Sequence, residues 1–321
     1  MNKQHAPFRR FLVVRNPVST NAAMALKRIT ALKRAFPGAE HVIVETLPGG
    51  RAANKALLEP HADKLGPDTL LCIAGGDGTI NMVLESLLGN PKLPARSRET
   101  PVLPLWGGNA NDLAHMLNGA GRKTDLPGLV RTGNVTKVYP LSCTLTDASG
   151  QARTHIAACY ISFGASALTA QTLSTTFRAR TLLSRMPVLR FIGELFIVVP
   201  AMTQAQTFLA TEDGRHKTIY EYVFFNGPRF AKINGVKRRL GEQTFHRALV
   251  EHKRLSNLLK SAVALMRPAE ADKLRAVRTE FTALEATWVQ FDGEATRVYA
   301  GTHVVVTVAD RPFYALSRRV Y

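Results

Sequence analysis

Short apolar runs alternate with longer stretches of helical spacing along the first third of the chain. The apolar runs predict buried strands at residues 10–16, 41–46, 69–75 and 102–106. The intervening stretches repeat their apolar residues at helical spacing and predict helices at residues 21–36, 51–58, 80–88 and 111–117. Such alternation is typical of a parallel sheet with helices on both faces. We therefore expect an N-terminal, doubly wound α/β domain over residues 8–138.

The pattern changes near residue 138, where segments rich in β-branched and aromatic residues follow one another. These segments predict strands at residues 137–147, 152–164, 204–211, 218–227, 244–252, 279–287 and 303–310. Turn sequences separate several of them, and two helical segments are expected near residues 173–199 and 254–266. We therefore expect a C-terminal, mostly antiparallel β-rich domain over residues 139–308, followed by a tail, 309–321, that returns to the first domain.

The composition predicts a cytoplasmic globular protein. Its 321 residues, 45% of them hydrophobic, are enough for two domains. The most apolar stretch, residues 191–202, is too short to span a membrane and contains Glu194 and Pro200. The first residues lack the pattern of a signal peptide. The three cysteines are widely spaced in apolar runs, so we expect reduced core residues rather than a disulfide or a metal site.

The net charge changes this picture. A formal charge of +18 favours an anionic partner such as a lipid headgroup, a phosphorylated substrate or nucleic acid, although a solvated basic surface is the simpler explanation. Residues 171–280 contain 19 Lys and Arg against 9 Asp and Glu, so 19 − 9 = +10 of the charge lies there. No zinc-finger spacing or aromatic RNA-binding motif accompanies the charge, and nucleic acid is therefore not favoured.

A glycine-rich break with a carboxylate in it, Gly75-Gly76-Asp77-Gly78-Thr79, follows the third predicted strand. Glycines there allow positive φ and let phosphates approach the backbone, and the N–H groups at the start of the next helix attract anions. A carboxylate in such a place is suited to bind a metal or a hydroxyl, or to act as a base. The alternative is that Asp77 only caps the helix.

The other three predicted strands end in similar polar loops. Residues 16–20 (NPVST), 46–53 (TLPGGRAA) and 107–112 (GGNAND) place small, hydroxyl or amide residues before a helix. Because parallel strands end at the same edge of a sheet, these loops together predict a nucleotide-phosphate site.

These motifs and their order resemble the diacylglycerol kinase catalytic-domain family, which includes bacterial lipid kinases and sphingosine kinases. The shared motifs are NPVST, Thr46 with Gly50 and Ala52, GGDGT followed by Asn81, GNAND, and the late Asp292-Gly293-Glu294. GGDGT alone is shared with NAD kinases, whereas the ordered set is specific. The resemblance runs from about residue 11 to residue 316.

The resemblance implies an ATP-dependent lipid kinase that binds its nucleotide in a cleft between the two domains and uses Mg²⁺ with ATP. The nucleotide contacts that carry over are Asn16, Pro17, Ser19, Thr20, Thr46, Gly75, Gly76, Asp77, Gly78, Thr79, Asn81, Gly108, Asn109, Asn111 and Asp112. The catalytic residues are Asp77 and Glu294, of which Glu294 corresponds to the family's proton acceptor.

The sequence departs from the family pattern at two single residues and in one segment. Asn109 replaces a threonine after Trp106 and Gly107, and Thr20 replaces a glycine. In place of the family's acidic segment, which is linked with a structural magnesium, residues 228–245 are basic and keep only Glu242 beside Lys237, Arg238 and Arg239. We therefore expect that secondary metal site to be absent or altered.

The favoured hypothesis is a peripheral membrane enzyme that phosphorylates a diacylglycerol-like or sphingoid-like lipid at an anionic membrane surface. The sequence does not specify the oligomeric state, and a homodimer is one possibility. Residues 185–200 are either a cover for the lipid tail or a core helix, and Arg178, Arg180, Arg185 and Arg190 flank or lie within them. The alternatives are an NAD kinase-like or other small-molecule kinase, and a nucleotide- or lipid-binding homologue without turnover.

Overall fold

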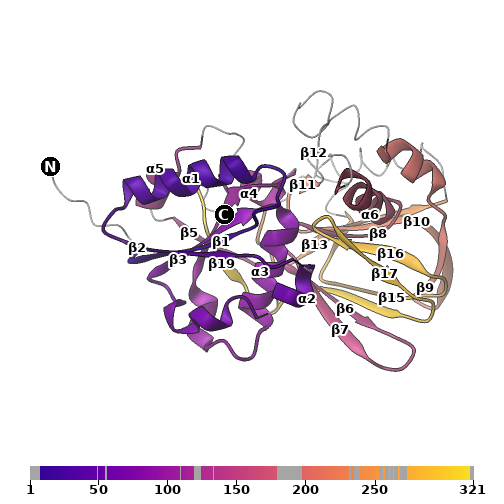
Figure 1. Cartoon of the computed structure of the whole chain (residues 1–321). Coiled ribbons are helices and arrows are strands. Elements are labelled where there is room, and N and C mark those ends of the chain that lie inside the picture. Colours follow the sequence, from indigo (N-terminus) through magenta and orange to yellow (C-terminus); the bar gives the residue numbers. More distant parts are fainter. Residues whose placement is uncertain are drawn as a thin grey trace. The chain divides into compact units, whose positions relative to one another are not determined.

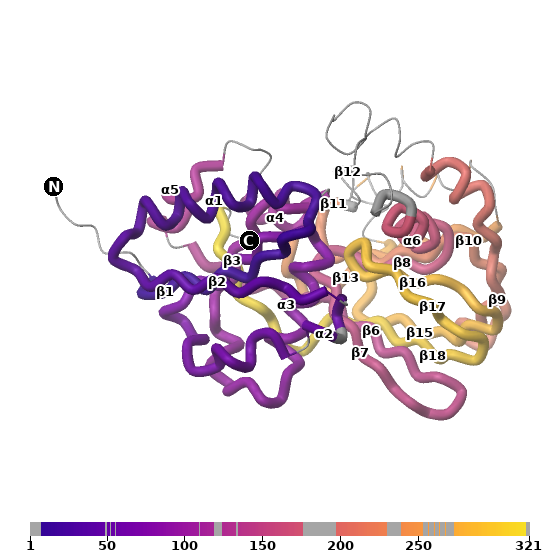
Figure 2. Tube along the Cα trace, in the orientation of Figure 1, coloured from indigo at the N-terminus to yellow at the C-terminus, as the bar shows by residue number. Residues whose placement is uncertain are grey.

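The computed structural model describes residues 8–48, 50–54, 56–108, 110–118, 124–132, 134–178, 197–230, 233–234, 239–252, 256, 260, 263, 267 and 273–318. The chain divides into two units (Figures 1 and 2). Unit 1 contains Met1–Pro140, Arg239–Gly241 and Asp310–Tyr321, and unit 2 contains Leu141–Arg238 and Glu242–Ala309.

Unit 1 is built on a six-stranded sheet with the strand order β2-β1-β3-β4-β19-β5. Its strands are β1 (Arg10–Arg15), β2 (Glu40–Glu45), β3 (Thr69–Gly75), β4 (Pro101–Trp106), β5 (Val135–Val138) and β19 (Phe313–Leu316). All neighbours are parallel except β19 and β5. The residues of β3 are all buried, which explains why this strand reads as an unbroken apolar run.

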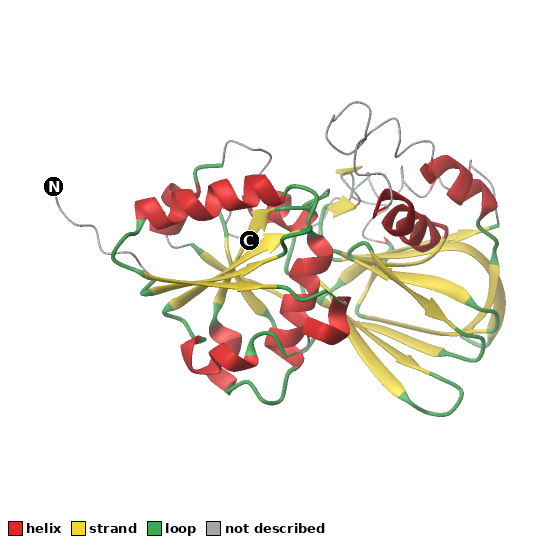
Figure 3. Cartoon of the chain, viewed as in Figure 1, coloured by secondary structure: helices red, strands yellow, loops and turns green. Residues whose placement is uncertain are grey.

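Helices cover both faces of this sheet (Figure 3). The helices of unit 1 are α1 (Ala22–Ala35), α2 (Gly50–Asn54), α3 (Asp77–Gly89), α4 (Asp112–Asn118), α5 (Leu126–Thr132), and the 3₁₀ turns η1 (Glu59–Lys64) and η2 (Ala95–Glu99). One core cluster joins Ile29 and Leu32 of α1 and Leu129 of α5 to alternate residues of the strands, such as Phe11 and Cys72. The strand residues between them, such as Leu12 and Ile73, are fully buried on the opposite face.

Unit 2 is built on an eleven-stranded sheet in which every neighbouring pair is antiparallel. The order is β17-β16-β8-β10-β9-β15-β18-β6-β7, and β13 pairs with β10 and β14. The bounds are β6 (Leu141–Thr146), β7 (Ala152–Ala157), β8 (Tyr160–Gly164), β9 (Phe208–Glu212), β10 (Arg215–Phe225), β13 (Phe245–Glu251), β14 (Arg275–Ala276), β15 (Arg278–Ala283), β16 (Thr287–Phe291), β17 (Glu294–Val298) and β18 (His303–Val308). Helix α6 (Ala165–Arg178) packs on β8, β16 and β17, and a small separate sheet joins β11 (Arg229–Phe230) to β12 (Ile233–Asn234).

The predicted fold class is therefore confirmed, with local differences. Residues 152–164, expected as one strand, form β7 and β8 with a bend at Ala158 and Cys159. The helix expected near residue 173 begins at Ala165, and residues 179–196 lie outside the described part of the chain. The helix expected at residues 51–58 ends at Asn54, and most of residues 253–272 also lie outside the described part.

Two expectations from composition concern buried groups and membrane spans. All three cysteines are buried free thiols, and burial raises the pKa of Cys72 and Cys143 far above the usual thiol value. Among the described residues, every helix is too short or too polar to cross a bilayer.

Candidate nucleotide site

The four loops predicted to bind phosphate lie at one edge of unit 1. Strands β2, β1, β3 and β4 are consecutive and parallel, so their carboxyl ends lie at the same edge of the sheet. The backbone joins these ends, because Asn16 N–H donates to Ala74 O at 2.9 Å and Gly107 N–H donates to Gly75 O at 3.0 Å. The sheet topology therefore brings the predicted loops of unit 1 into neighbouring positions.

The glycines of the β3 and β4 loops are required by close backbone packing. A Cβ built on Gly108 would lie 2.2 Å from Gly76 Cα, and one on Gly107 would lie 2.8 Å from Gly75 Cα. A Cβ on Gly75 would meet the Thr79 side chain at 2.5 Å. Gly75, Gly76 and Gly78 do not have positive φ, so the conformational reason given for them from the sequence was wrong. The absence of side chains at Gly76, Gly107 and Gly108 lets the loops after β3 and β4 pack against each other.

Asn16 connects the loop after β1 to α3. Its Nδ2 donates to Thr79 Oγ1 at 3.0 Å, while its Oδ1 accepts the N–H of Val18 at 3.1 Å. Ser19 Oγ donates to the Asn16 carbonyl at 2.9 Å. Pro17 and Thr20 are exposed residues of the same loop, and Thr20 does not have positive φ. The threonine in place of glycine is therefore compatible with this loop.

Two asparagines support the loop after β4. Asn111, in the left-handed region at φ 53°, accepts the Gly108 N–H through Oδ1 and donates to the Gly108 carbonyl through Nδ2, both at 2.9 Å. Asn21 also donates to Gly108 O, at 2.6 Å, and its N–H donates to Gly107 O at 2.8 Å. Asn109 lies outside the described residues. Asn21 was missed in the sequence because its contacts are with a loop that is distant along the chain.

The loop after β2 is held by another residue missed in the sequence, Asn54. Asn54 is buried, and its side chain accepts the Leu47 N–H at 2.8 Å and donates to the carbonyls of Leu47 and Gly50. The half-buried Thr46 begins this loop, and Arg51 forms an ion pair with Glu85 of α3. The loop is thereby tied at both ends.

Asp77 is the first residue of α3, one position after its N-cap, Gly76. The N-cap Gly76 has no side chain to cap the helix. Asp77 Oδ1 accepts the N–H of Leu113, in the first turn of α4, at 3.4 Å. Asp112, which starts α4, is fully buried. The half-buried Asp77 carboxylate thus stands between the starts of two helices, where N–H groups remain for an anion.

Asn81 is fully buried one turn further along α3. Neither its Oδ1 nor its Nδ2 has a hydrogen-bond partner among the described residues. An unpaired buried amide costs about 1–3 kcal/mol. A ligand or a water molecule that reaches Asn81 would remove this cost.

Trp106, the last residue of β4, is packed between two side chains. Its ring lies 4.1 Å from the His115 ring, and the Arg28 guanidinium lies 5.2 Å from the indole. Burial lowers the pKa of Arg28 below its usual value. Trp106 therefore anchors the loop to α1 and α4.

In unit 2, Glu294 follows a tight turn between β16 and β17. Asp292 and Gly293 have φ values of 51° and 89°, as in the two-residue hairpin turns favoured by Asp-Gly. The buried Asp292 carboxylate accepts the N–H groups of Ala158, Cys159 and Tyr160 at 2.6, 3.0 and 2.8 Å. This anchor fixes the turn, and Glu294 is half-buried as the first residue after it.

The basic segment after β10 shows no cluster of acids in its described part. Glu242 lies 3.7 Å from the Arg275 guanidinium, Arg239 is exposed, and Lys237 and Arg238 lie outside the described residues. Groups of three or more His, Cys, Asp or Glu side chains suited to a metal are not found among the described residues.

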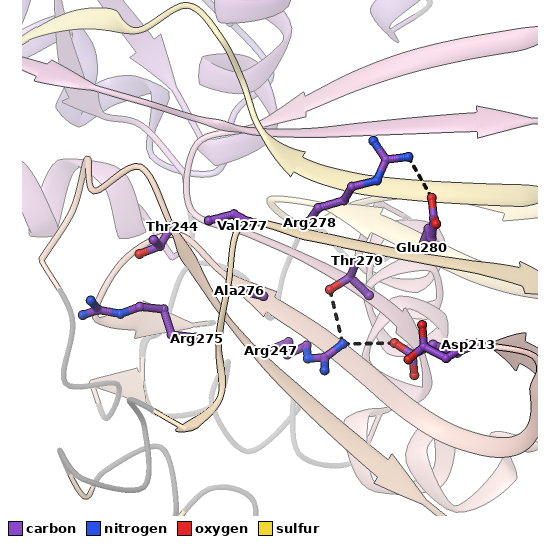
Figure 4. Close-up of a pocket in the computed structure, with 10 residues that line it drawn as sticks. Asp213, Thr244, Arg247, Arg275, Ala276, Val277, Arg278, Thr279 and Glu280 are labelled. Atoms are coloured by element: carbon purple, nitrogen blue, oxygen red, sulfur yellow. Dashed lines mark hydrogen bonds and ion pairs between the residues drawn. The ribbon is translucent and has the colours of Figure 1, made fainter.

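Unit 2 also contains a hollow of about 690 Å³, between β9, β13 and β15 (Figure 4). Its lining includes Arg247, Arg275, Arg278 and Thr244, and none of the residues predicted for nucleotide binding or catalysis. This hollow is therefore a separate feature of unit 2.

Strand ends and helix starts arranged as in unit 1 are typical of nucleotide-binding α/β proteins. The family model that matches residues 10–142 is that of the diacylglycerol kinase catalytic domain. The resemblance seen in the motifs is thereby confirmed over these residues. A comparison with curated proteins finds no match.

Solved structures share the fold over nearly the whole chain. A crystal structure of a candidate diacylglycerol kinase from Bacillus anthracis str. Sterne has a TM-score of 0.65 and 17% identity, and covers 97% of this chain and 98% of that chain. A structure of a diacylglycerol kinase from the same organism has a TM-score of 0.60 and 16% identity, covering 97% of each chain. At these identities the similarity shows the fold, and the family match supports a kinase that uses a nucleotide.

Proposed function

We propose that the protein transfers the γ-phosphate of ATP to the hydroxyl group of a lipid. The observation that carries this proposal is the position of the Asp77 carboxylate between the starts of α3 and α4, in loops held by the Gly76–Gly108 contact. Backbone N–H groups in such a place bind phosphate, and a carboxylate beside them is suited to a phosphate-bound cation. When bound with ATP, Mg²⁺ supplies charge neutralisation during phosphoryl transfer.

In this proposal, the residues of unit 1 bind and orient the triphosphate. The first-turn N–H groups of α3 are the phosphate donors, and the backbone around Gly108 packs beside them. Asn16 and Asn111 keep the loops in place through their hydrogen bonds to Thr79 and Gly108. A site held rigid before the ligand arrives loses less entropy on binding, and its donors need not reorganise during the reaction.

Glu294 is the proposed proton acceptor. A hydroxyl that attacks phosphorus must lose its proton, and a positioned carboxylate can accept it. The anchoring of Asp292 by three N–H groups, directly before Glu294, supports this assignment because it fixes the backbone from which the carboxylate projects.

A lipid acceptor is proposed because the matched family model is that of diacylglycerol kinases and the solved structures with this fold include proteins described in that way. We further propose that the net charge of +18 attracts the enzyme to anionic membranes. Arg180, Arg185 and Arg190, beside the apolar segment at residues 185–200, lie outside the described residues, as does the Arg178 side chain.

The test is incubation of the purified protein with labelled ATP, Mg²⁺ and a total lipid extract, followed by mass spectrometry of the labelled product. The proposal expects a phosphorylated diacylglycerol-like or sphingoid-like lipid, and loss of that product in the Glu294→Gln variant. A parallel assay with NAD and other soluble alcohols tests the small-molecule alternative. Labelling of a soluble acceptor alone, or no turnover of any acceptor, would overturn the lipid kinase assignment.

A further inference from the structure

The core of unit 2 ends in a cluster of polar and charged side chains. Along β13, Phe245 belongs to the apolar core and Leu249 packs against it, so Arg247, between them in the alternation, faces the core side. By the same alternation, Glu212 follows Phe208 and Ala210 on β9, and Thr279 precedes Phe281 and Ala283 on β15. Tyr222 of β10 completes the cluster.

Glu212 is the centre of this cluster, with a side chain only 3% exposed. It accepts the Tyr222 hydroxyl at 2.7 Å and forms ion pairs with Lys217 and, at 3.1 Å, with Arg247. Burial raises the pKa of Tyr222 well above its usual value, which keeps the phenol protonated as a donor. An ion pair of this kind, in which the carboxylate is buried and its basic partners are partly exposed, contributes little to stability. Stability alone is therefore a poor reason for four polar side chains at this end of the core.

Arg247 is held by one nitrogen only. Its Nη1 contacts Glu212, the Tyr222 hydroxyl at 3.4 Å and Thr279 Oγ1 at 3.5 Å. Within the part of the chain that the structure describes, these are the contacts of its side chain, so Nε and Nη2 keep their donor capacity. In Figure 4 the Arg247 guanidinium lies in the hollow with its bonded nitrogen toward Thr279. The Arg247 side chain is 42% exposed, so a ligand can reach it.

The other arginines of the hollow already have acidic partners. Arg278 pairs with Glu280 at 2.7 Å, and Arg275 lies 3.7 Å from Glu242. The lining contains three arginines, Arg247, Arg275 and Arg278, and three acids, Glu212, Asp213 and Glu280, so its formal charge is balanced. A balanced lining does not attract a polyanion such as a nucleotide. It favours a ligand with a single oxyanion that is recognised by directed hydrogen bonds.

We propose that this hollow is a second ligand site, in which Arg247 binds the phosphate or carboxylate group of a small molecule. The two donors on one side of a guanidinium match the two oxygens of such a group. The hollow has a volume of about 690 Å³, which lies within the range of about 300–1,000 Å³ that is usual for small-molecule sites. The ligand is either a soluble phosphate ester or carboxylate, or the headgroup of an anionic lipid. The site is independent of the proposed kinase reaction.

The first experiment reads out Arg247 itself. The full chain is treated with phenylglyoxal, which modifies accessible guanidinium groups, and the modification of each arginine is followed by mass spectrometry. Inorganic phosphate, glycerol 3-phosphate and vesicles with or without phosphatidic acid are the probes. We expect phenylglyoxal to modify Arg247 more slowly when a probe is present than when it is absent. The exposed Arg153 is the internal control, and its modification should not change. Protection by the soluble probes identifies a soluble ligand, and protection by phosphatidic acid vesicles alone identifies a headgroup.

The second experiment uses Arg247→Lys, which keeps the ion pair with Glu212 but loses the planar pair of donors. The affinity for the protecting probe should fall by about tenfold or more, while Arg153→Lys has no effect. Circular dichroism establishes that both variants are folded. Unchanged modification of Arg247 with every probe, or equal affinity of Arg247→Lys and the wild type, would overturn the proposal.

Discussion

Gly76 and Gly108 approach each other so closely that a Cβ on Gly108 would lie 2.2 Å from the Gly76 Cα. The residues belong to loops that follow different strands, β3 and β4. The contact joins the starts of α3 and α4, between which the Asp77 carboxylate lies.

Gly108→Ala should therefore disrupt the nucleotide site. The added methyl group meets backbone, which cannot move aside as a flexible side chain can, and overpacking of this kind costs about 1–3 kcal/mol. We expect weaker binding of a fluorescent ATP analogue and a lower melting temperature. The matched control is Gly89→Ala at the end of α3, where a Cβ has no neighbour within 4 Å. Equal effects of the two substitutions would show that the loop contact is unimportant.

Asp77→Ala should lower kcat by about 10²-fold or more while leaving the fold intact. The bond that Asp77 Oδ1 accepts from the Leu113 N–H is long, at 3.4 Å, so we expect α3 and α4 to keep their packing when it is removed. Steady-state kinase assays and circular dichroism measure the two effects, with the exposed Asp63→Ala as the control. Near-normal turnover in a folded variant would assign Asp77 only to the support of α4.

Glu294→Gln should reduce kcat much more than it changes the KM for ATP, because the amide keeps the shape of the side chain but cannot accept a proton. Asp292→Asn, two residues earlier, should instead lower stability, because a neutral amide replaces the carboxylate that accepts three N–H groups. Unfolding in urea and initial-rate kinetics separate the two effects. An unchanged kcat in Glu294→Gln would exclude it as the proton acceptor.

The buried Glu221 should make unit 2 less stable as the pH rises. Burial raises the pKa of Glu221 from 4.5 to about 7, although Ser166 donates to it. The folded state therefore binds the proton more tightly than the unfolded state. The stabilisation is complete below the unfolded pKa and is lost as the pH rises to about 7, by about 3 kcal/mol in total.

Urea unfolding between about pH 5 and pH 8 measures this effect. Trp106 and Trp288 are the two tryptophans of the chain, so a Trp106→Phe background leaves Trp288 of β16 as a reporter of unit 2. Glu221→Gln should flatten the pH dependence, whereas Glu251→Gln, exposed at the end of β13, should not. An equally steep dependence in Glu221→Gln would assign it to other groups.

Structural elements could be predicted from the sequence where the local residue pattern alone determines them. Strand β3 could be predicted to the residue because it is apolar after Thr69 and ends at a glycine pair. The helix after this break was expected at residues 80–88 but begins earlier, at Asp77. The reason for the glycines could not be predicted, because it depends on two loops that are distant along the chain.

Other features were missed because their partners are distant in sequence. Asn21 and Asn54 support the loops through bonds that no local pattern marks. Residues 152–164 were expected as one strand, and the bend at Ala158 was missed. This bend is stabilised by the carboxylate of Asp292, which lies far along the chain and leaves no local signal. The Arg247 cluster also depends on strands that meet only in the folded sheet.

Strand β19 has a consequence for the order in which the protein folds during synthesis. It occupies the place between β4 and β5 in the sheet of unit 1, yet the ribosome makes all of unit 2 before it. Until β19 emerges, the nascent sheet has a gap, with the edges of β4 and β5 unpaired and open to wrong partners. Unit 2 can fold while its strands are being made, whereas unit 1, whose translation begins first, is completed last.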